Sequence, residues 1–135
     1  MKIPIIIFTL GLCFWASEYN TLEDLRWKKR IVLIFPESKD YMMDVSDSLE
    51  VKMEDRDMVY FVFSDSLYSN TDLEFDSTYV EDLKSRYILG AKTSCWVLLG
   101  KDGGLKLRQE KDLDWDQAFN TVDALALKRQ MGIWE

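Results

Sequence analysis

The sequence predicts an α/β fold in which helices flank a four-stranded mixed sheet, and three observations support this. Residues 31–35 and 58–63 are apolar at every position, as in parallel strands that are covered on both faces. Apolar residues recur at four-residue intervals between these two runs, as they do along a crossover helix. An Asp-Gly turn at residues 102–103 joins two further strand-like runs and predicts an antiparallel hairpin. A chain of 135 residues suits a single domain.

The first half of the chain supplies a strand, a helix and a second strand. The first strand ends at Pro36, and Ser38 or Asp40 can cap the start of the helix. The apolar stripe of this helix is expected to consist of residues four positions apart: Tyr41, Val45, Leu49 and Met53. After the second strand, residues 64–77 are polar and rich in turn-forming side chains, so we expect a loop there.

The second half supplies a helix, a hairpin and a final helix. Tyr79, Leu83 and Tyr87 mark the first of these helices, and Gly90 is placed to terminate it. Residues 95–99 are expected to form a buried strand, and residues 105–108 alternate in polarity as an edge strand does.

The last helix is expected to open at Asp114, because Gln117 three residues later completes a capping-box pattern. Its apolar stripe consists of Trp115, Ala118, Val122 and Leu125. The complete order is β-α-β-α-β-β-α. The first two strands should be parallel with a right-handed connection, and the last two antiparallel. This order is that of the thioredoxin-like core.

The corner after the first strand is where a thioredoxin-type enzyme holds its reactive thiol, at a helix N-terminus that lowers the thiol pKa. Residues 36–41 contain no cysteine. Ser38 could stand in the nucleophile's place, but a serine needs a base and the chain has no histidine. We therefore expect Ser38 and Asp40 to act as helix caps.

The N-terminus has the pattern of a targeting segment. Residues 3–15 are almost wholly apolar and follow Lys2. This apolar run is too short to span a bilayer but suits the core of a signal peptide. We predict a signal peptide over residues 1–17 and a single domain over 18–135, exported to the periplasm, the envelope or the medium. The alternatives are a buried N-terminal element, an uncleaved anchor, and lipid attachment at Cys13.

Charge and cysteine content restrict the partners. The net charge of −7 disfavours nucleic acids and anionic membranes, so we expect a protein partner and no membrane insertion of the mature domain. Removal of the signal peptide leaves one cysteine, Cys95, which excludes an intrachain disulfide and a dithiol cycle. With one thiol and no histidine, metals that prefer nitrogen or sulfur have almost no ligands. No metal and no cofactor are predicted.

Cys95 at the start of the third strand has two interpretations. It is either a small buried apolar residue, which we favour, or a lone thiol that forms mixed disulfides or reduces peroxides with an external partner.

A basic cluster precedes the first strand: Arg26, Lys28, Lys29 and Arg30. It could bind an acidic partner or membrane phosphates, but we favour a solvated lead-in to the strand with Trp27 packed beneath it. Arg56-Asp57 precedes the second strand, and parallel strands start at the same end of a sheet. We expect ion pairs between the two segments.

Two other motifs receive structural interpretations. The acidic residues of the long loop, Asp65, Asp72, Glu74 and Asp76, are oxygen ligands of the kind calcium prefers, but they lack the spacing of an EF-hand loop, so we favour a solvated loop. Lys101-Asp-Gly-Gly104 joins two strands, whereas a phosphate loop opens a helix, so we interpret it as a turn.

Three sequence boxes carry a resemblance to a known family. They are Leu25-Arg-Trp-Lys28 with Arg30, Arg56-Asp57, and Gly100-Lys-Asp-Gly-Gly-Leu-Lys-Leu-Arg108. Together they resemble the domain of unknown function numbered 4174, which occurs in short secreted bacterial proteins and as modules of animal sushi-repeat matrix proteins. The resemblance covers roughly residues 20–131. It implies a thioredoxin-like fold without a proven activity. The family's Met-Pro-Met-Arg-like segment is replaced by Leu125-Ala-Leu-Lys-Arg129.

The residues of these boxes are candidates for a structural or still unknown role: Arg26, Trp27, Lys28, Arg30, Arg56, Asp57, Lys101, Asp102, Gly103, Gly104, Lys106 and Arg108. The sequence thus predicts an exported, non-catalytic binding domain without a Cys-x-x-Cys site. The alternative is a single-cysteine thiol oxidoreductase or peroxidase-like enzyme that uses Cys95.

Overall fold

The structure is a computed structural model that describes residues 19–132. Its elements are the 3₁₀ helix η1 (Leu22–Leu25), β1 (Arg30–Phe35), α1 (Asp47–Glu54), β2 (Met58–Phe63), β3 (Leu67–Ser69), α2 (Ser77–Tyr87), β4 (Cys95–Leu99), β5 (Leu105–Gln109) and α3 (Trp115–Gln130). The predicted signal peptide and Cys13 lie outside the described residues.

The elements form one mixed sheet with the strand order β3-β2-β1-β4-β5. β1 and β2 are parallel, and β4 pairs antiparallel with both β1 and β5. The parallel β1–β2 pair and the antiparallel β4–β5 hairpin were predicted. The sheet has five strands rather than four, because β3 forms inside the expected loop and pairs antiparallel with β2. β3 is three residues long, too short to show a periodic pattern.

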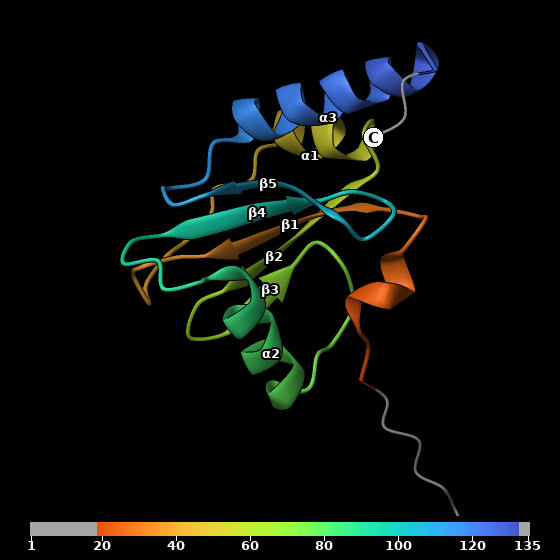
Figure 1. Ribbon diagram of the computed structural model, residues 1–135. Helices are drawn as coiled ribbons and strands as arrows, with labels where there is room; N and C mark the ends of the chain where they lie inside the picture. Colours follow the sequence, from red (N-terminus) through yellow and green to blue (C-terminus); the bar gives the residue numbers. More distant parts are fainter. Residues whose placement is uncertain (1–18, 133–135) are drawn as a thin grey trace, which may run out of the picture.

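Helices cover both faces of the sheet (Figure 1). Ile31, Leu33 and Phe35 point to the face covered by α2 and η1. Val32 and Ile34 point to the face covered by α1 and α3. This two-sided burial explains why β1 and β2 are apolar at every position.

Helix α1 is shorter than the sequence predicted. It begins at Asp47, and the Ser46 hydroxyl accepts a hydrogen bond from the backbone N–H of Leu49, so Ser38 and Asp40 are not its caps. The apolar residues before it are packed toward the α1 and α3 face at alternate positions: Tyr41, Met43 and Val45. Alternation is the period of extended chain. The four-residue spacing from Tyr41 to Val45 therefore corresponds to two periods of the two-residue repeat of an extended segment.

The later elements follow the sequence closely. At the start of α3 the Asp114 carboxylate accepts a hydrogen bond from the backbone N–H of Gln117 at 3.1 Å, as the capping pattern predicted. Ala118 and Val122 are fully buried. Gly90 lies just beyond α2 with φ of +77°, a conformation that glycine adopts without strain.

Candidate functional site

The corner after β1 is held by turn hydrogen bonds. The backbone N–H of Glu37 donates to the Ser94 hydroxyl at 3.0 Å, which ties the corner to the residue before β4. The Ser38 hydroxyl accepts from the backbone N–H of Asp40 at 3.2 Å. Ser38 therefore closes a local turn.

Cys95 lies beside this corner, paired with Phe35 across the β1–β4 ladder. It lines a cleft of about 310 Å³ together with Pro36, Lys84 and Lys92. Its side chain is nonetheless only 1% exposed, and burial raises the pKa of the Cys95 thiol. The thiolate is the reactive form of a cysteine, and burial disfavours that form at Cys95. Cys95 is a free thiol, and the described residues contain no Cys-x-x-Cys pair and no disulfide.

Arg108 reaches the same region from β5 and closes the end of α2. Its guanidinium donates from Nε to the carbonyl oxygen of Tyr87 at 2.8 Å and from Nη2 to the carbonyl oxygen of Ile88. It also pairs with Glu110 at 2.9 Å. The last carbonyls of a helix lack partners within the helix, so Arg108 supplies the donors that α2 needs.

The opposite end of the sheet carries the basic cluster. Trp27 has φ of +67° and donates its backbone N–H to the carbonyl oxygen of Lys101 at 2.6 Å. Its side chain is 67% exposed, and the Arg26 guanidinium lies 5.1 Å from the ring centroid. The expectation that Trp27 packs beneath the cluster is wrong. A positive φ turns the side chain to the opposite side from that of an ordinary residue, here into solvent.

Asp57 joins this end of the sheet through two ion pairs. Its carboxylate lies 4.0 Å from Lys29 Nζ and 2.8 Å from Lys101 Nζ. The hydrogen bond from Lys101 lowers the pKa of Asp57. Arg30 donates from its Nη1 to the carbonyl oxygen of Arg56 at 2.8 Å. The Lys29–Asp57 pair is one of those expected between the two segments.

Arg56 forms its ion pair outside the two segments between which the sequence analysis expected pairing. It forms a two-pronged ion pair with Asp123 on α3, with distances of 2.9 Å and 3.1 Å, and its guanidinium lies 4.8 Å from the Phe119 ring centroid. Arg56 also donates to the carbonyl oxygen of Lys52. It thus fastens the end of α1 to α3. Sequence reasoning missed Asp123, whose only signal was its position one helical turn after Phe119.

The hairpin between β4 and β5 is a turn, as predicted. The backbone N–H of Gly100 donates to the carbonyl of Gly104 at 2.9 Å, and Gly103 has φ of +82°. The backbone N–H of Gly104 donates to the Asp102 carboxylate, which lowers the pKa of Asp102, and Lys106 pairs with the same carboxylate at 3.2 Å. These bonds account for the charged residues of the box.

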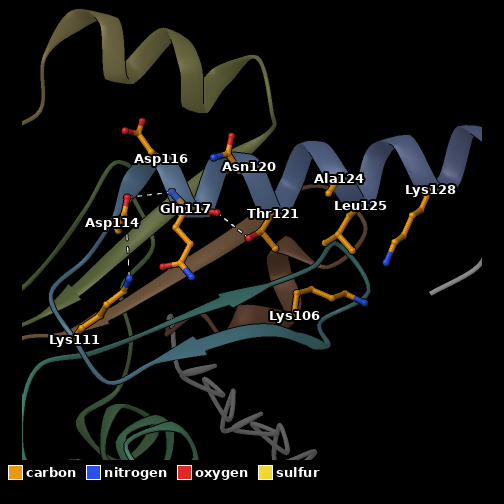
Figure 2. Close-up of a pocket in the computed structure, with 10 residues that line it drawn as sticks. All are labelled: Lys106, Lys111, Asp114, Asp116, Gln117, Asn120, Thr121, Ala124, Leu125 and Lys128. Carbon is orange, nitrogen blue, oxygen red and sulfur yellow. Dashed lines mark hydrogen bonds and ion pairs between the residues drawn. The ribbon is translucent and has the colours of Figure 1, made fainter.

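An open cleft of about 650 Å³ lies between α3 and β5 (Figure 2). Its walls carry lysines, of which Lys111 pairs with Asp114 at 3.9 Å and Lys106 with Asp102. Figure 2 also shows Asp114 bonded to the start of α3 and Thr121 bonded back to Gln117. Three of the five charged side chains that line the cleft, Lys106, Lys111 and Asp114, are thus used in local pairs.

Residues 19–132 contain neither a grouped metal site nor a membrane-spanning helix. No three acidic, cysteine or histidine side chains in this part of the chain are grouped to hold a metal ion. Asp76 of the acidic loop is instead the residue that precedes α2. None of the helices in the same part is long and apolar enough to cross a membrane.

Residues 21–131 match the family described as Domain of unknown function (DUF4174). The chain belongs to this family. Searches of curated proteins and of solved structures gave no match.

The DUF4174 box residues divide into two groups in this structure. One group is used internally, as Arg108 is at the end of α2 and Asp57 is by Lys101. The other group is exposed and comprises Arg26, Trp27 and Lys28. Within the exposed group, Arg26 pairs with Glu23 at 3.5 Å and lies over the Trp27 ring.

Proposed function

We propose that this DUF4174 member is an exported thioredoxin-like domain that acts by binding a protein and has no thiol chemistry. The arrangement of its elements supports the fold assignment. β1 and β2 are parallel and joined through α1, β4 and β5 form an antiparallel hairpin, and α2 covers the opposite face from α1 and α3 (Figure 1). β3 adds an edge strand to that core.

The observation that carries the proposal is the state of the corner after β1. A thioredoxin-type enzyme needs an accessible thiol of low pKa there. Among the described residues, the thiol in this neighbourhood is that of Cys95, with 1% exposure and a pKa raised by burial. The Arg108 guanidinium acts in the opposite direction but is outweighed by desolvation. Because the corner carries no accessible thiol of low pKa, we infer that the domain acts by binding through its solvent-facing side chains.

Export is supported by the apolar run 3–15 at the N-terminus. Its test is the N-terminal sequence of the protein recovered from producing cells. We expect a chain that begins near residue 18 and is found outside the cytosol. A chain that keeps Met1 and stays in the cytosol would contradict export.

The thiol is tested by alkylation. In a Cys13→Ser chain, where Cys95 is the only thiol, native protein at pH 6 should react with iodoacetamide far more slowly than a model thiol. The same protein unfolded in urea should react at the model rate. Fast native labelling, together with peroxide consumption that Cys95→Ser abolishes, would establish the single-cysteine oxidoreductase instead.

A further inference from the structure

The geometry points to the exposed residues Arg26, Trp27 and Lys28, together with Lys29, as a docking surface for an acidic segment of a partner protein. We call these four residues the Trp27 surface. The inference rests on the proposed binding function and names the surface and the partner chemistry. The surface lies beside the N-terminal end of β1, next to the β4–β5 hairpin (Figure 1).

Trp27 has a backbone conformation that is unfavourable for a bulky residue. Its φ of +67° is the left-handed region, which bulky residues rarely occupy. Backbone bonds hold it there: its own N–H reaches Lys101, and the N–H groups of Lys28 and Lys29 reach the Leu25 carbonyl at 3.0 Å and 2.9 Å. A glycine would adopt this turn without strain and make the same bonds.

The indole gives little back to the fold. It is 67% exposed, so it removes little apolar surface from water, and the Arg26 guanidinium lies 5.1 Å from its ring centroid. A strained, exposed tryptophan is costly to keep and is of the residue type that most often anchors protein interfaces. Stability therefore does not account for Trp27, whereas recognition does.

The Trp27 surface is basic, opposite in sign to the net charge of the chain. The chain carries −7 overall, yet positions 26 and 28–30 are all basic. Lys28 makes no ion pair within the described residues, and the side chains of Arg26 and Lys29 are 44% and 41% exposed. Exposed cations around an aromatic ring complement carboxylates, and they speed the encounter with an acidic partner.

The surroundings of the basic residues favour a protein segment over a membrane as the partner. Carboxylates surround the basic residues: Glu23 beside Arg26, Asp57 beside Lys29, and Asp102 in the adjacent hairpin, with side chains 73%, 50% and 45% exposed. A flat anionic bilayer would be brought against these carboxylates as well as the cations. A narrow acidic peptide can contact Trp27 and Lys28 without covering the surrounding carboxylates. A polyanion such as a nucleic acid meets the same repulsion.

The test is a selection of random peptides displayed on phage against the full chain, followed by anisotropy titration with the best synthetic peptide. We expect selected peptides rich in Asp and Glu, with an affinity that falls as salt is raised. Trp27→Gly, which keeps the turn, should weaken binding about tenfold or more, as loss of an interface tryptophan does. Lys28→Glu should also weaken it severalfold.

Matched controls lie elsewhere on the surface. Lys39→Glu makes the same charge change at another exposed lysine, and Met42→Ala removes an apolar side chain that is 86% exposed. Both should leave affinity within about twofold, because isolated exposed side chains contribute little. Circular dichroism and thermal unfolding check that each variant is folded.

Three results would overturn the inference. One is a selection without acidic enrichment. Another is that Trp27→Gly and Lys28→Glu bind the selected peptide as tightly as the unchanged chain does. The third is binding to vesicles of equal parts phosphatidylcholine and phosphatidylglycerol that Trp27→Gly abolishes, which would assign the surface to membranes. These failures are distinct from failure of the proposed function, since a fast-reacting Cys95 would refute that proposal whatever the peptides do.

Discussion

Replacement of Arg108 by methionine tests whether this box residue serves the fold. Methionine keeps an unbranched apolar stem but removes the guanidinium. In the structure that group donates to the carbonyl oxygens of Tyr87 and Ile88 and pairs with Glu110, and its side chain is 21% exposed. The substitution therefore removes both guanidinium hydrogen bonds at the end of α2, while the Ile88 carbonyl keeps the backbone N–H of Ala91 at 3.0 Å.

The size of the loss follows from these contacts. A hydrogen bond from a charged donor contributes about 1.5 kcal/mol or more when partly buried, and two are lost here. The Glu110 pair adds little, because the Glu110 side chain is 51% exposed. The expected loss is about 2–3 kcal/mol. With a urea slope of about 2 kcal/mol per molar, the unfolding midpoint should fall by about 1–1.5 M.

The assay is equilibrium unfolding in urea, with Arg129→Met as the control. Arg129 is exposed in the last turn of α3 and undergoes the same chemical change. Its variant should shift the midpoint by a small fraction of the Arg108 effect. Arg108→Lys should recover part of the loss, since lysine keeps a charged donor without the fork. If Arg108→Met and Arg129→Met unfold alike, Arg108 does not stabilise the end of α2.

Three further outcomes follow from the other end of the sheet. Trp27→Gly should be about 0.5–1 kcal/mol more stable than Trp27→Ala in urea unfolding, because glycine relieves the left-handed φ at some cost in unfolded-chain entropy; the reverse order would refute the strain. A double-mutant cycle on Arg56→Met and Asp123→Asn should give a coupling of about 1 kcal/mol, whereas additive losses would show that the pair contributes nothing. The depressed pKa of Asp57 means that its contribution is complete above its ordinary pKa of 3.8 and is lost as pH falls through the lower native pKa. The stability gap between the unchanged chain and Lys101→Met should therefore be constant near neutrality and shrink in acid, and a gap that persists to the lowest pH would contradict the pair.

Buried strands were the most predictable part of the fold. The runs 58–63 and 95–99 are strands at those bounds, because burial on both faces leaves an unbroken apolar signal. The helix after β1 was predicted too early for a physical reason. Tyr41 and Val45 pack toward the α1 and α3 face in either an extended or a helical chain, and a spacing of four satisfies both periods.

Side-chain partners were less predictable than elements. Arg108 binds carbonyl oxygens, which every residue carries, so no sequence pattern marks its partners. Trp27 was placed on the wrong side of the chain because the sign of its φ is set by the bond to Lys101, distant in sequence. Asp123 meets Arg56 only through the packing of α3 on the sheet.

The most direct test of the central claim is the alkylation rate of Cys95 as a function of urea. If the thiol is sealed at the start of β4, iodoacetamide reaches it only when the domain unfolds. In the Cys13→Ser chain, the opening free energy derived from labelling should then equal the global unfolding free energy and decline with the same urea slope. Labelling that is fast in the absence of urea and independent of its concentration would show a thiol open to chemistry, contradicting the account of this domain as a binding protein.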